Sequence, residues 1–161
     1  MTTTLQTVAT IAAALGAGIA GGVYLAFPAL VMPALRTLPA QTAVAAMQRI
    51  NVSAVRLPFM VVFFGGAAAA ATIIISELVS GAITDEGPVR MVGAALAMAA
   101  VGITIVRNVP LNDQLARIMP DSLDMADRWR SFDRNWSTAN HVRAFAAIAA
   151  TVTLAVSLAT T

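Results

Sequence analysis

The sequence of 161 residues contains no cysteine and a single histidine, His141. Without cysteine, the protein has no disulfide, thiol nucleophile, iron–sulfur cluster or cysteine-ligated zinc. One histidine excludes a bis-histidine haem within the chain, and the lack of a Glu-x-x-His pair argues against a di-iron carboxylate bundle. A metal held by His141 with Asp113 or Asp133 stays open as an alternative, but one imidazole and scattered acids make a poor site. We therefore predict no metal site.

Charged residues are also scarce, at 11% of the chain against about 25% in a soluble domain. Hydrophobic residues make up 58%, and the mean hydropathy is +0.79. Too little polar material is present to cover a water-facing surface, so lipid must be the solvent for much of the chain. Every basic residue is an arginine, and the arginines form no run or stripe of the kind that nucleic-acid binding requires. The length fits one domain, residues 1–161.

Long apolar stretches predict transmembrane helices, because a span needs roughly 20 apolar residues. They lie at about residues 5–33, 57–78, 90–107 and 138–160. No Lys or Arg precedes Arg36, so the first span lacks the positive region of a signal peptide, and we expect it to be retained. The predicted fold is all-α, a four-helix transmembrane bundle with additional short amphipathic helices near residues 40–50 and 123–134. The second of these can continue into the fourth span.

The arginines predict the orientation of the bundle. Four spans put both termini on one side, and the other side then holds residues 34–56 and 107–140, which carry eight arginines. The turn at residues 81–90 carries only Arg90. Because loops rich in Lys and Arg stay in the cytoplasm, we place the two larger segments there and both termini outside. We expect the protein in the cell membrane, whether inner or plasma membrane.

Small residues recur at every fourth position along the spans and predict close packing of the helices. They are Ala14, Gly18, Gly22 and Ala26 in the first span and Gly66 and Ala70 in the second, and the third span continues the pattern with Ala94, Met98 and Gly102. The pattern GAGIAG at residues 16–21 matches a dinucleotide-binding fingerprint, but it follows no strand and opens no βαβ unit, so we interpret it as packing. The predicted bundle is tight, with little room for an aqueous pore.

Two single residues carry local predictions. Pro110 should end the third helix at the cytoplasmic face, because proline lacks a backbone N–H and clashes with the preceding turn. Glu77 lies near the outer end of the second span, where we expect its carboxylate to reach towards the interface.

Polar and aromatic residues with helical spacing mark the entrance to the fourth span. Trp129, Asp133, Trp136, Asn140 and Arg143 follow one another at intervals of four, three, four and three, which places them on one helical face. An aromatic belt at the membrane interface is the alternative for the two tryptophans. It does not explain an amide and a guanidinium at the mouth of a span, where polar groups are costly and usually face the bundle interior.

His141 lies beside this face and is the only side chain of a type that exchanges protons near neutral pH. Its alternative is an interfacial histidine that satisfies a backbone carbonyl. More polar residues gather at the same level, at the cytoplasmic ends of the second and third spans: Asn51, Arg56, Arg107, Asn108 and Asn112. Helix caps and orientation charges are the alternative here, but the concentration of amides at one end of the bundle favours a pocket.

Several motifs resemble the bacterial branch of the anthrone oxygenase-like membrane family, formerly a domain of unknown function. They are FPALVMPAL at 27–35, MQRIN at 47–51, FFG at 63–65, NVPLN at 108–112, and Trp136 with NHVR at 140–143. The resemblance covers nearly the whole chain, and the last two motifs are the specific ones. It implies a four-helix membrane protein. Fungal members are similar to enzymes that oxidise an anthrone to an anthraquinone with O₂, without an evident organic cofactor.

The resemblance also implies a mechanism in which the anion of a lipophilic aromatic substrate reacts directly with O₂, the co-substrate. His141 would be the base, and Arg143 or Arg107 would stabilise the developing oxyanion. The substrate would be oriented by Asn140, Asn108, Asn112 and Asn51, and it would stack on Trp129 and Trp136. No metal or other cofactor is then required.

Two other classes of function remain open. The same pocket would serve a non-catalytic binder or transporter of a lipophile, although a transporter is expected to show broken helices or repeats at the midplane. In a subunit of a larger membrane complex, the polar face would instead contact a partner. The expected partners are the lipid bilayer and a lipophilic small molecule, and a homo-oligomer is compatible with the sequence.

Overall fold

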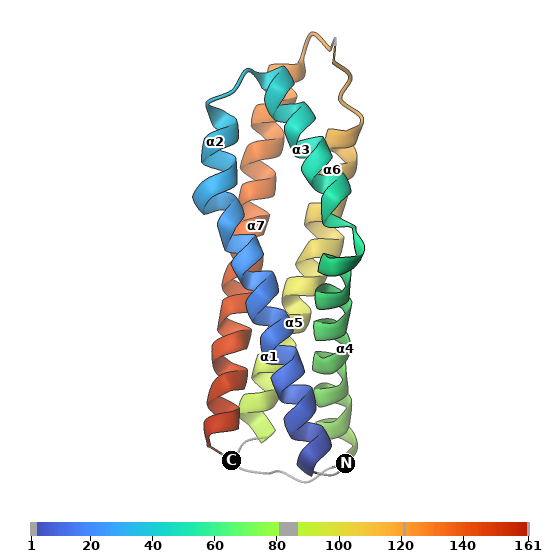
Figure 1. Cartoon of the computed structure of the whole chain (residues 1–161), viewed down its shortest axis with the longest axis vertical. Coiled ribbons are helices and arrows are strands. Elements are labelled where there is room, and N and C mark those ends of the chain that lie inside the picture. Colours follow the sequence, from blue (N-terminus) through green and yellow to red (C-terminus); the bar gives the residue numbers. More distant parts are fainter. Residues whose placement is uncertain (1–2, 81–86, 121, 161) are drawn as a thin grey trace.

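The computed structural model describes residues 3–80, 87–120 and 122–160, so part of the predicted 81–90 turn lies outside it. These residues form helices and short turns, without a strand among them, which confirms the all-α prediction. The elements in chain order are α1 (Thr3–Ala26), η1 (Phe27–Val31), α2 (Met32–Arg36), α3 (Ala40–Ala54), α4 (Leu57–Ser80), α5 (Gly87–Ile103), η2 (Thr104–Asn108), α6 (Val109–Ala116) and α7 (Met125–Ala159). Here η denotes a π-helical turn (Figure 1).

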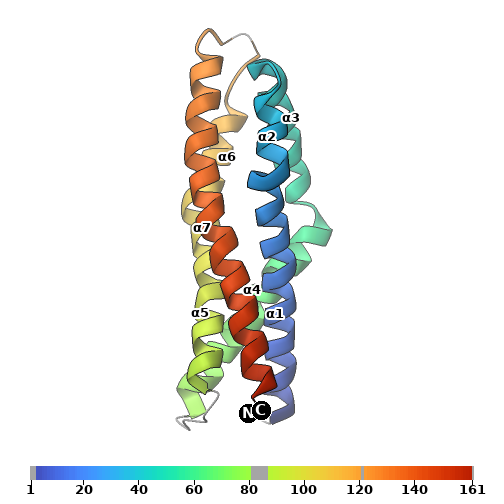
Figure 2. The same cartoon turned by 90° about the vertical axis from the view of Figure 1, so that its left-hand side faces the viewer.

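Four helical segments of the described chain are long and apolar enough to cross a bilayer. They are Thr4–Arg36, Leu57–Val79, Gly87–Ala116 and Met125–Ala159. The protein is therefore a multi-pass membrane protein, as predicted. Neighbouring helices run in opposite directions, and α1 packs on α4 and α7, while α5 packs on the same two helices from the other side. The result is an up-and-down bundle with both termini at one end (Figures 1 and 2).

The opposite end of the bundle, which we call the distal end, holds α2, α3, α6 and the beginning of α7 (Figure 2). The predicted helix at 123–134 does continue into the fourth span, giving a single helix of 35 residues. At 1.5 Å per residue it is about 52 Å long, well beyond a hydrocarbon layer of about 30 Å. Its projecting part is covered by a separate hydrophobic core that includes Met32, Met47, Leu115 and Trp129.

Proline does not end the third helix, so the prediction for Pro110 is wrong. The helical backbone passes from α5 through η2 into α6, and Pro110 lies in the first turn of α6. The wide turn of η2, closed by the Val109 N–H to the Thr104 carbonyl, changes the hydrogen-bond register just before the proline. Proline is tolerated in a first helical turn because the N–H that it lacks has no regular partner there.

Close helix packing is built on small residues, but only partly on the predicted ones. A Cβ added to Gly16 would lie 2.6 Å from the Gly66 Cα, so α1 and α4 approach with their backbones nearly in contact. Gly18 and Gly21 face α7. The GAGIAG pattern therefore lies within a helix and serves packing, as interpreted. Gly22 and Gly102 have open space where a side chain would be, so those two predictions are wrong.

The end of the bundle near the termini contains a buried ion pair. Arg90 Nε of α5 lies 2.8 Å from Glu77 Oε1 of α4, and both side chains are less than a tenth exposed. Glu77 therefore does not extend to the interface as expected, because a cation on the adjacent helix reaches it. A paired charge avoids much of the cost that a lone carboxylate would have in the membrane.

Candidate functional site

A cavity of about 680 Å³ lies in the distal half of the bundle, between α1, α3, α4, the η2–α6 segment and α7. Beyond Tyr24 and Phe63 the free space falls to a cavity of about 30 Å³, because α1 and α4 are in close contact at Gly16 and Gly66. The predicted tight packing thus holds for the half near the termini only. Aromatic side chains dominate the cavity wall, namely Tyr24, Phe27, Phe59, Phe63, Phe64 and Trp136.

Several of these rings contact one another. Tyr24 and Phe59 meet edge to face with centroids 6.3 Å apart, and Phe59 stacks on Phe63 at 6.3 Å. The Phe27 ring lies 5.1 Å from that of Trp136. Ring faces and edges directed at one space suit a flat aromatic ligand, since offset and edge-to-face contacts both stabilise such pairs.

Arg143 of α7 is the buried cation of the cavity wall and is only 7% exposed. Its guanidinium carbon lies 3.9 Å from the centroid of the Tyr24 ring. The Nη1 group donates to the Thr104 hydroxyl at 3.3 Å, and Nη2 donates to the Asn140 side-chain oxygen. Nε is buried and has no hydrogen-bond partner in the described part of the chain.

Nor does any Asp or Glu of that part form an ion pair with Arg143. Burying a cation costs free energy unless an anion or sufficient hydrogen bonds compensate it. The cation–π contact and two hydrogen bonds supply part of that compensation. The guanidinium therefore keeps donor capacity that an anionic group could use.

Asn140 positions Arg143 and joins α7 to α1. It is fully buried, and its Nδ2 donates to the Tyr24 carbonyl at 2.6 Å. Four residues after Tyr24 stands Pro28, which has no N–H, so this carbonyl lacks its regular helical donor. The Asn140 amide replaces that donor while its oxygen accepts from Arg143. A single side chain, Asn140, thereby contacts both the backbone of α1 before Pro28 and the Arg143 guanidinium.

Polar residues of the third span face α7 along one stripe. Thr104 accepts from Arg143, and Asn112 accepts from the Trp136 indole N–H at 2.8 Å. Asn108 lies between them at intervals of four residues and is 1% exposed, yet neither atom of its amide has a partner among the described residues. An unsatisfied buried amide is costly, and Asn108 does not itself line the cavity.

A comparison with known families matches the part of the chain that carries most of these residues. The family model described as anthrone oxygenase matches residues 59–153, which is more than half of the chain. The chain belongs to the anthrone oxygenase family. The matched region contains most of the aromatic residues of the cavity wall and all of the polar stripe of the third span, and it also contains Arg143. No curated protein and no solved structure matches the chain.

In this anthrone oxygenase family member, the predicted site residues divide into three groups. Arg143, Asn112, Trp136 and Asn51 line the cavity. Asn140 and Asn108 are buried, Asn140 behind the wall as the support of Arg143 and Asn108 between two wall residues. His141, Arg107 and Trp129 do not line the cavity.

Each member of the third group has another environment. His141 is exposed, and its Nδ1 lies 2.7 Å from the Ser137 carbonyl, as in the alternative for this residue. Arg107 is exposed as well. Trp129 belongs to the distal core, where its ring stacks on Phe132 with centroids 5.7 Å apart.

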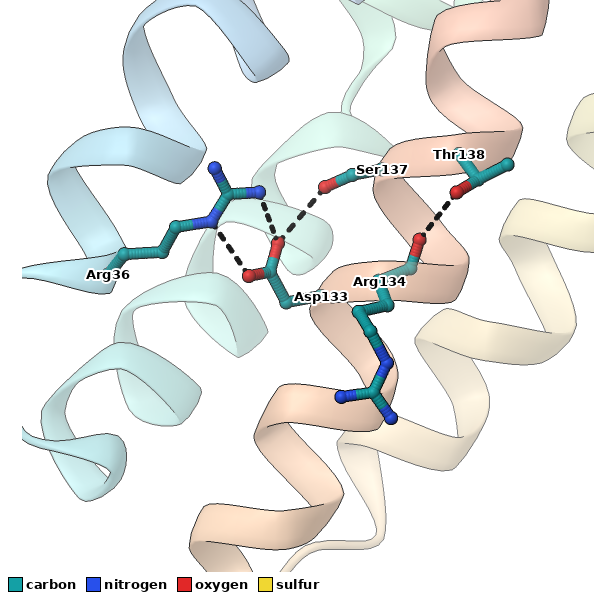
Figure 3. Close-up of polar contacts among 5 residues, drawn as sticks. All are labelled: Arg36, Asp133, Arg134, Ser137 and Thr138. Carbon is teal, nitrogen blue, oxygen red and sulfur yellow. Dashed lines mark hydrogen bonds and ion pairs between the residues drawn. The ribbon is translucent and has the colours of Figure 1, made fainter.

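Asp133 also serves the distal end and not the cavity. Figure 3 shows its carboxylate bound by Arg36, with Nε at 2.8 Å and Nη2 at 2.9 Å, while the Ser137 hydroxyl donates to it at 3.0 Å. This contact ties α2 to α7. One of the two acids considered for a metal is therefore already engaged, and the described residues contain no group of three His, Asp or Glu side chains close enough to hold a metal ion.

Tyr24, Thr104 and the phenylalanines of α4 also line the cavity, although none of them was predicted as a site residue. Two signals could have revealed the first two. Tyr24 precedes Pro28 by four residues, which frees its carbonyl for a side-chain donor. Thr104 stands four residues before Asn108 and eight before Asn112, on the same polar stripe.

Proposed function

We propose that the protein oxidises a lipophilic aromatic substrate of the anthrone class with O₂, and that the reaction takes place in the distal cavity. The observation that carries the proposal is the combination of an aromatic cavity and one buried cation, Arg143, that lacks an acidic partner in the described chain. The family supports the reaction class, because the matching family model is described as anthrone oxygenase.

The cavity has the dimensions and the chemistry that such a substrate requires. Its volume of about 680 Å³ lies within the range of about 300–1,000 Å³ that holds small organic ligands. A three-ring aromatic body would lie between the rings of α1 and α4 and that of Trp136. Asn112 and Asn51 would offer amides to its oxygen substituents.

The reaction balances without an organic cofactor. The substrate loses a proton from its methylene carbon, and the resulting anion transfers one electron to O₂. Recombination of the radical with superoxide forms a C–O bond, giving a peroxide on that carbon. Loss of the second proton with cleavage of the O–O bond produces the second carbonyl and releases hydroxide, so that one anthrone and one O₂ yield one anthraquinone and one water.

Arg143 contributes by stabilising the anion, whose charge is largely on the carbonyl oxygen. A preorganised and buried cation lowers the free energy of such a charge more than water does. Thr104 and Asn140 hold the guanidinium in place. The described cavity wall contains no carboxylate and no imidazole, so the proton is released to water at the α3 rim, formed by Arg49, Asn51 and Ser53.

We infer from the arginine count that this cavity faces the cytoplasm. Residues 34–56 and 107–140, which form the distal end and its connections, carry eight arginines, against Arg90 near the termini. By the positive-inside rule both termini are then outside the cytoplasm. A lipophilic product would be released at the inner face of the cell membrane.

Oxygen consumption tests the proposal. The purified protein in detergent is mixed with dithranol, and O₂ uptake and quinone absorbance are followed against protein-free micelles. We expect saturable turnover with one O₂ consumed per quinone. Rates equal to those of empty micelles would refute the proposal for this substrate. His141→Ala belongs in the same series: because the imidazole lies outside the cavity, we expect full turnover, and its loss would support the base role predicted from the sequence.

Non-catalytic binding at the same cavity is the competing function, and the same preparation separates the two. Ligand binding alone would change the fluorescence of Trp136, which lines the cavity, without O₂ uptake. A saturable fluorescence change with no turnover would assign the cavity to a carrier or sensor of lipophiles.

A further inference from the structure

One wall of the cavity is also part of the outer surface of the bundle. Phe64, Ile105 and Val109 line the cavity, and they are 63%, 59% and 45% exposed. A side chain that lines an internal space and is half-exposed must lie at an opening. All three are apolar, so the opening has an apolar rim.

The helix arrangement explains where this opening arises. Along its length α4 packs against α1 and α5, whereas the continuation of α5, η2 and α6, packs against α7 and α3. The third span therefore leaves α4 in the distal half, at the level of the π-helical turn. Phe64 stands on one side of the resulting opening, and Ile105 and Val109 stand on the other.

Phe64 and Ile105 lie on the lipid side of the nearest arginines, whereas Val109 lies two residues beyond Arg107 towards the distal end. Phe64 follows Arg56 by eight residues, about 12 Å along a helix, and Ile105 precedes the exposed Arg107 by two. Arginines at span ends extend to the headgroup level. Next to Ile105, Val106 is 69% exposed, as expected for a residue in contact with lipid.

We propose that the cavity opens sideways into the hydrocarbon layer, through the opening between Phe64 and Ile105–Val109, and that lipophiles, acyl chains included, enter it from the bilayer. The polar α3 rim is then a separate contact with water. This route concerns access and holds whether or not the ligand is oxidised. It lets a poorly soluble ligand reach Arg143 without crossing water.

Quenching of tryptophan fluorescence by brominated lipid tests this route. The chain has two tryptophans, so Trp129→Phe leaves Trp136, which lines the cavity and is 2% exposed. This variant is reconstituted into phosphatidylcholine vesicles with bromine near the middle of one acyl chain, and into unbrominated vesicles. A parallel titration with acrylamide reports access from water. We expect strong quenching by the bromolipid despite the burial of Trp136.

Two neighbouring substitutions provide the matched control. In the same background, Ile105→Phe narrows the opening, whereas Val106→Phe adds the same bulk to a lipid-facing position that does not line the cavity. Bromolipid quenching that falls in the Ile105→Phe variant, and stays unchanged in the Val106→Phe variant, supports lateral entry. If bromolipid quenches Trp136 equally in the Ile105→Phe and Val106→Phe variants, the bromine acts from outside the cavity. That result would overturn the proposal.

Two more outcomes would also overturn it. Quenching by acrylamide without quenching by bromolipid would show that the cavity opens to water alone. No quenching by either reagent would show a closed cavity. Val109→Phe, on the same side of the opening, repeats the test if Ile105→Phe does not fold, and circular dichroism of each vesicle preparation verifies the helical fold.

Discussion

Replacement of Arg143 by methionine should abolish most of the catalytic advantage while leaving the bundle folded. The guanidinium has five N–H donors, and two are used by the Thr104 and Asn140 contacts. The remaining donors include Nε, which has no partner among the described residues. Loss of one preorganised oxyanion donor costs about 10²–10³ in kcat, or about 3–4 kcal/mol. We therefore expect Arg143→Met to lower kcat by at least about 10²-fold.

The stability of the same variant should change little, because two effects oppose each other. Removing a buried cation that has no acidic partner in the described chain relieves its desolvation cost, whereas the buried Asn140 oxygen loses its donor, at a cost of about 1–3 kcal/mol. Thermal unfolding in detergent should therefore give a Tm close to that of the wild type.

Stopped-flow quinone absorbance, at several dithranol concentrations, separates kcat from KM. Arg107→Met is the control, because that arginine is exposed and does not line the cavity. Arg143→Lys keeps the charge but not the fork of donors, so it should fall between methionine and wild type. A folded Arg143→Met protein with a kcat within about threefold of the wild type would refute the stabilising role, since the loss predicted for one donor is at least about 10²-fold.

Three further substitutions test the packing around the site by thermal unfolding. Asn140→Leu leaves the proline-freed carbonyl of α1 without a donor and should cost about 1–3 kcal/mol, whereas an unchanged Tm would show that this bond does not hold the helices together. Gly16→Val forces α1 and α4 apart and should destabilise the protein by about 1–3 kcal/mol. Gly22→Val is the control, because Gly22 has open space around it and its replacement should not lower the stability. Similar losses of stability in the two variants would contradict the close contact of α1 and α4. Glu77→Leu removes the anion beside Arg90 and should lower the stability by about 3–5 kcal/mol. Adding Arg90→Leu should restore most of that stability. A double variant that is no more stable than Glu77→Leu would argue against the ion pair.

The fold was largely predictable because composition and arginine placement determine the spans of a membrane protein. The details that failed depend on neighbours far apart in the sequence. Glu77 was expected at the interface because the sequence does not show that Arg90 lies opposite it. Pro110 was expected to end a helix because the π-helical turn that accommodates it is not visible in a hydrophobic pattern.

Part of the site was predictable, because polar side chains in a membrane span are themselves a signal. Arg143, Asn140 and Asn112 are costly in a membrane, so their presence at span mouths indicates a buried role. Tyr24 and Thr104 carry no such signal, because both residue types are common in apolar helices. Their place in the site follows from the helix pairing that sets Arg143 beside them.

Oxidation of a lipophilic aromatic inside the distal cavity is best tested by a variant with added bulk at the cavity wall. Ala54 and Ala45 are both exposed residues of α3, but only Ala54 lines the cavity. The measurement is the rate of quinone formation from dithranol by vesicles containing wild-type protein, Ala54→Trp or Ala45→Trp, each corrected for protein-free vesicles. We expect turnover by the wild type and by Ala45→Trp, and loss of turnover in Ala54→Trp. Equal rates in all three preparations would contradict it.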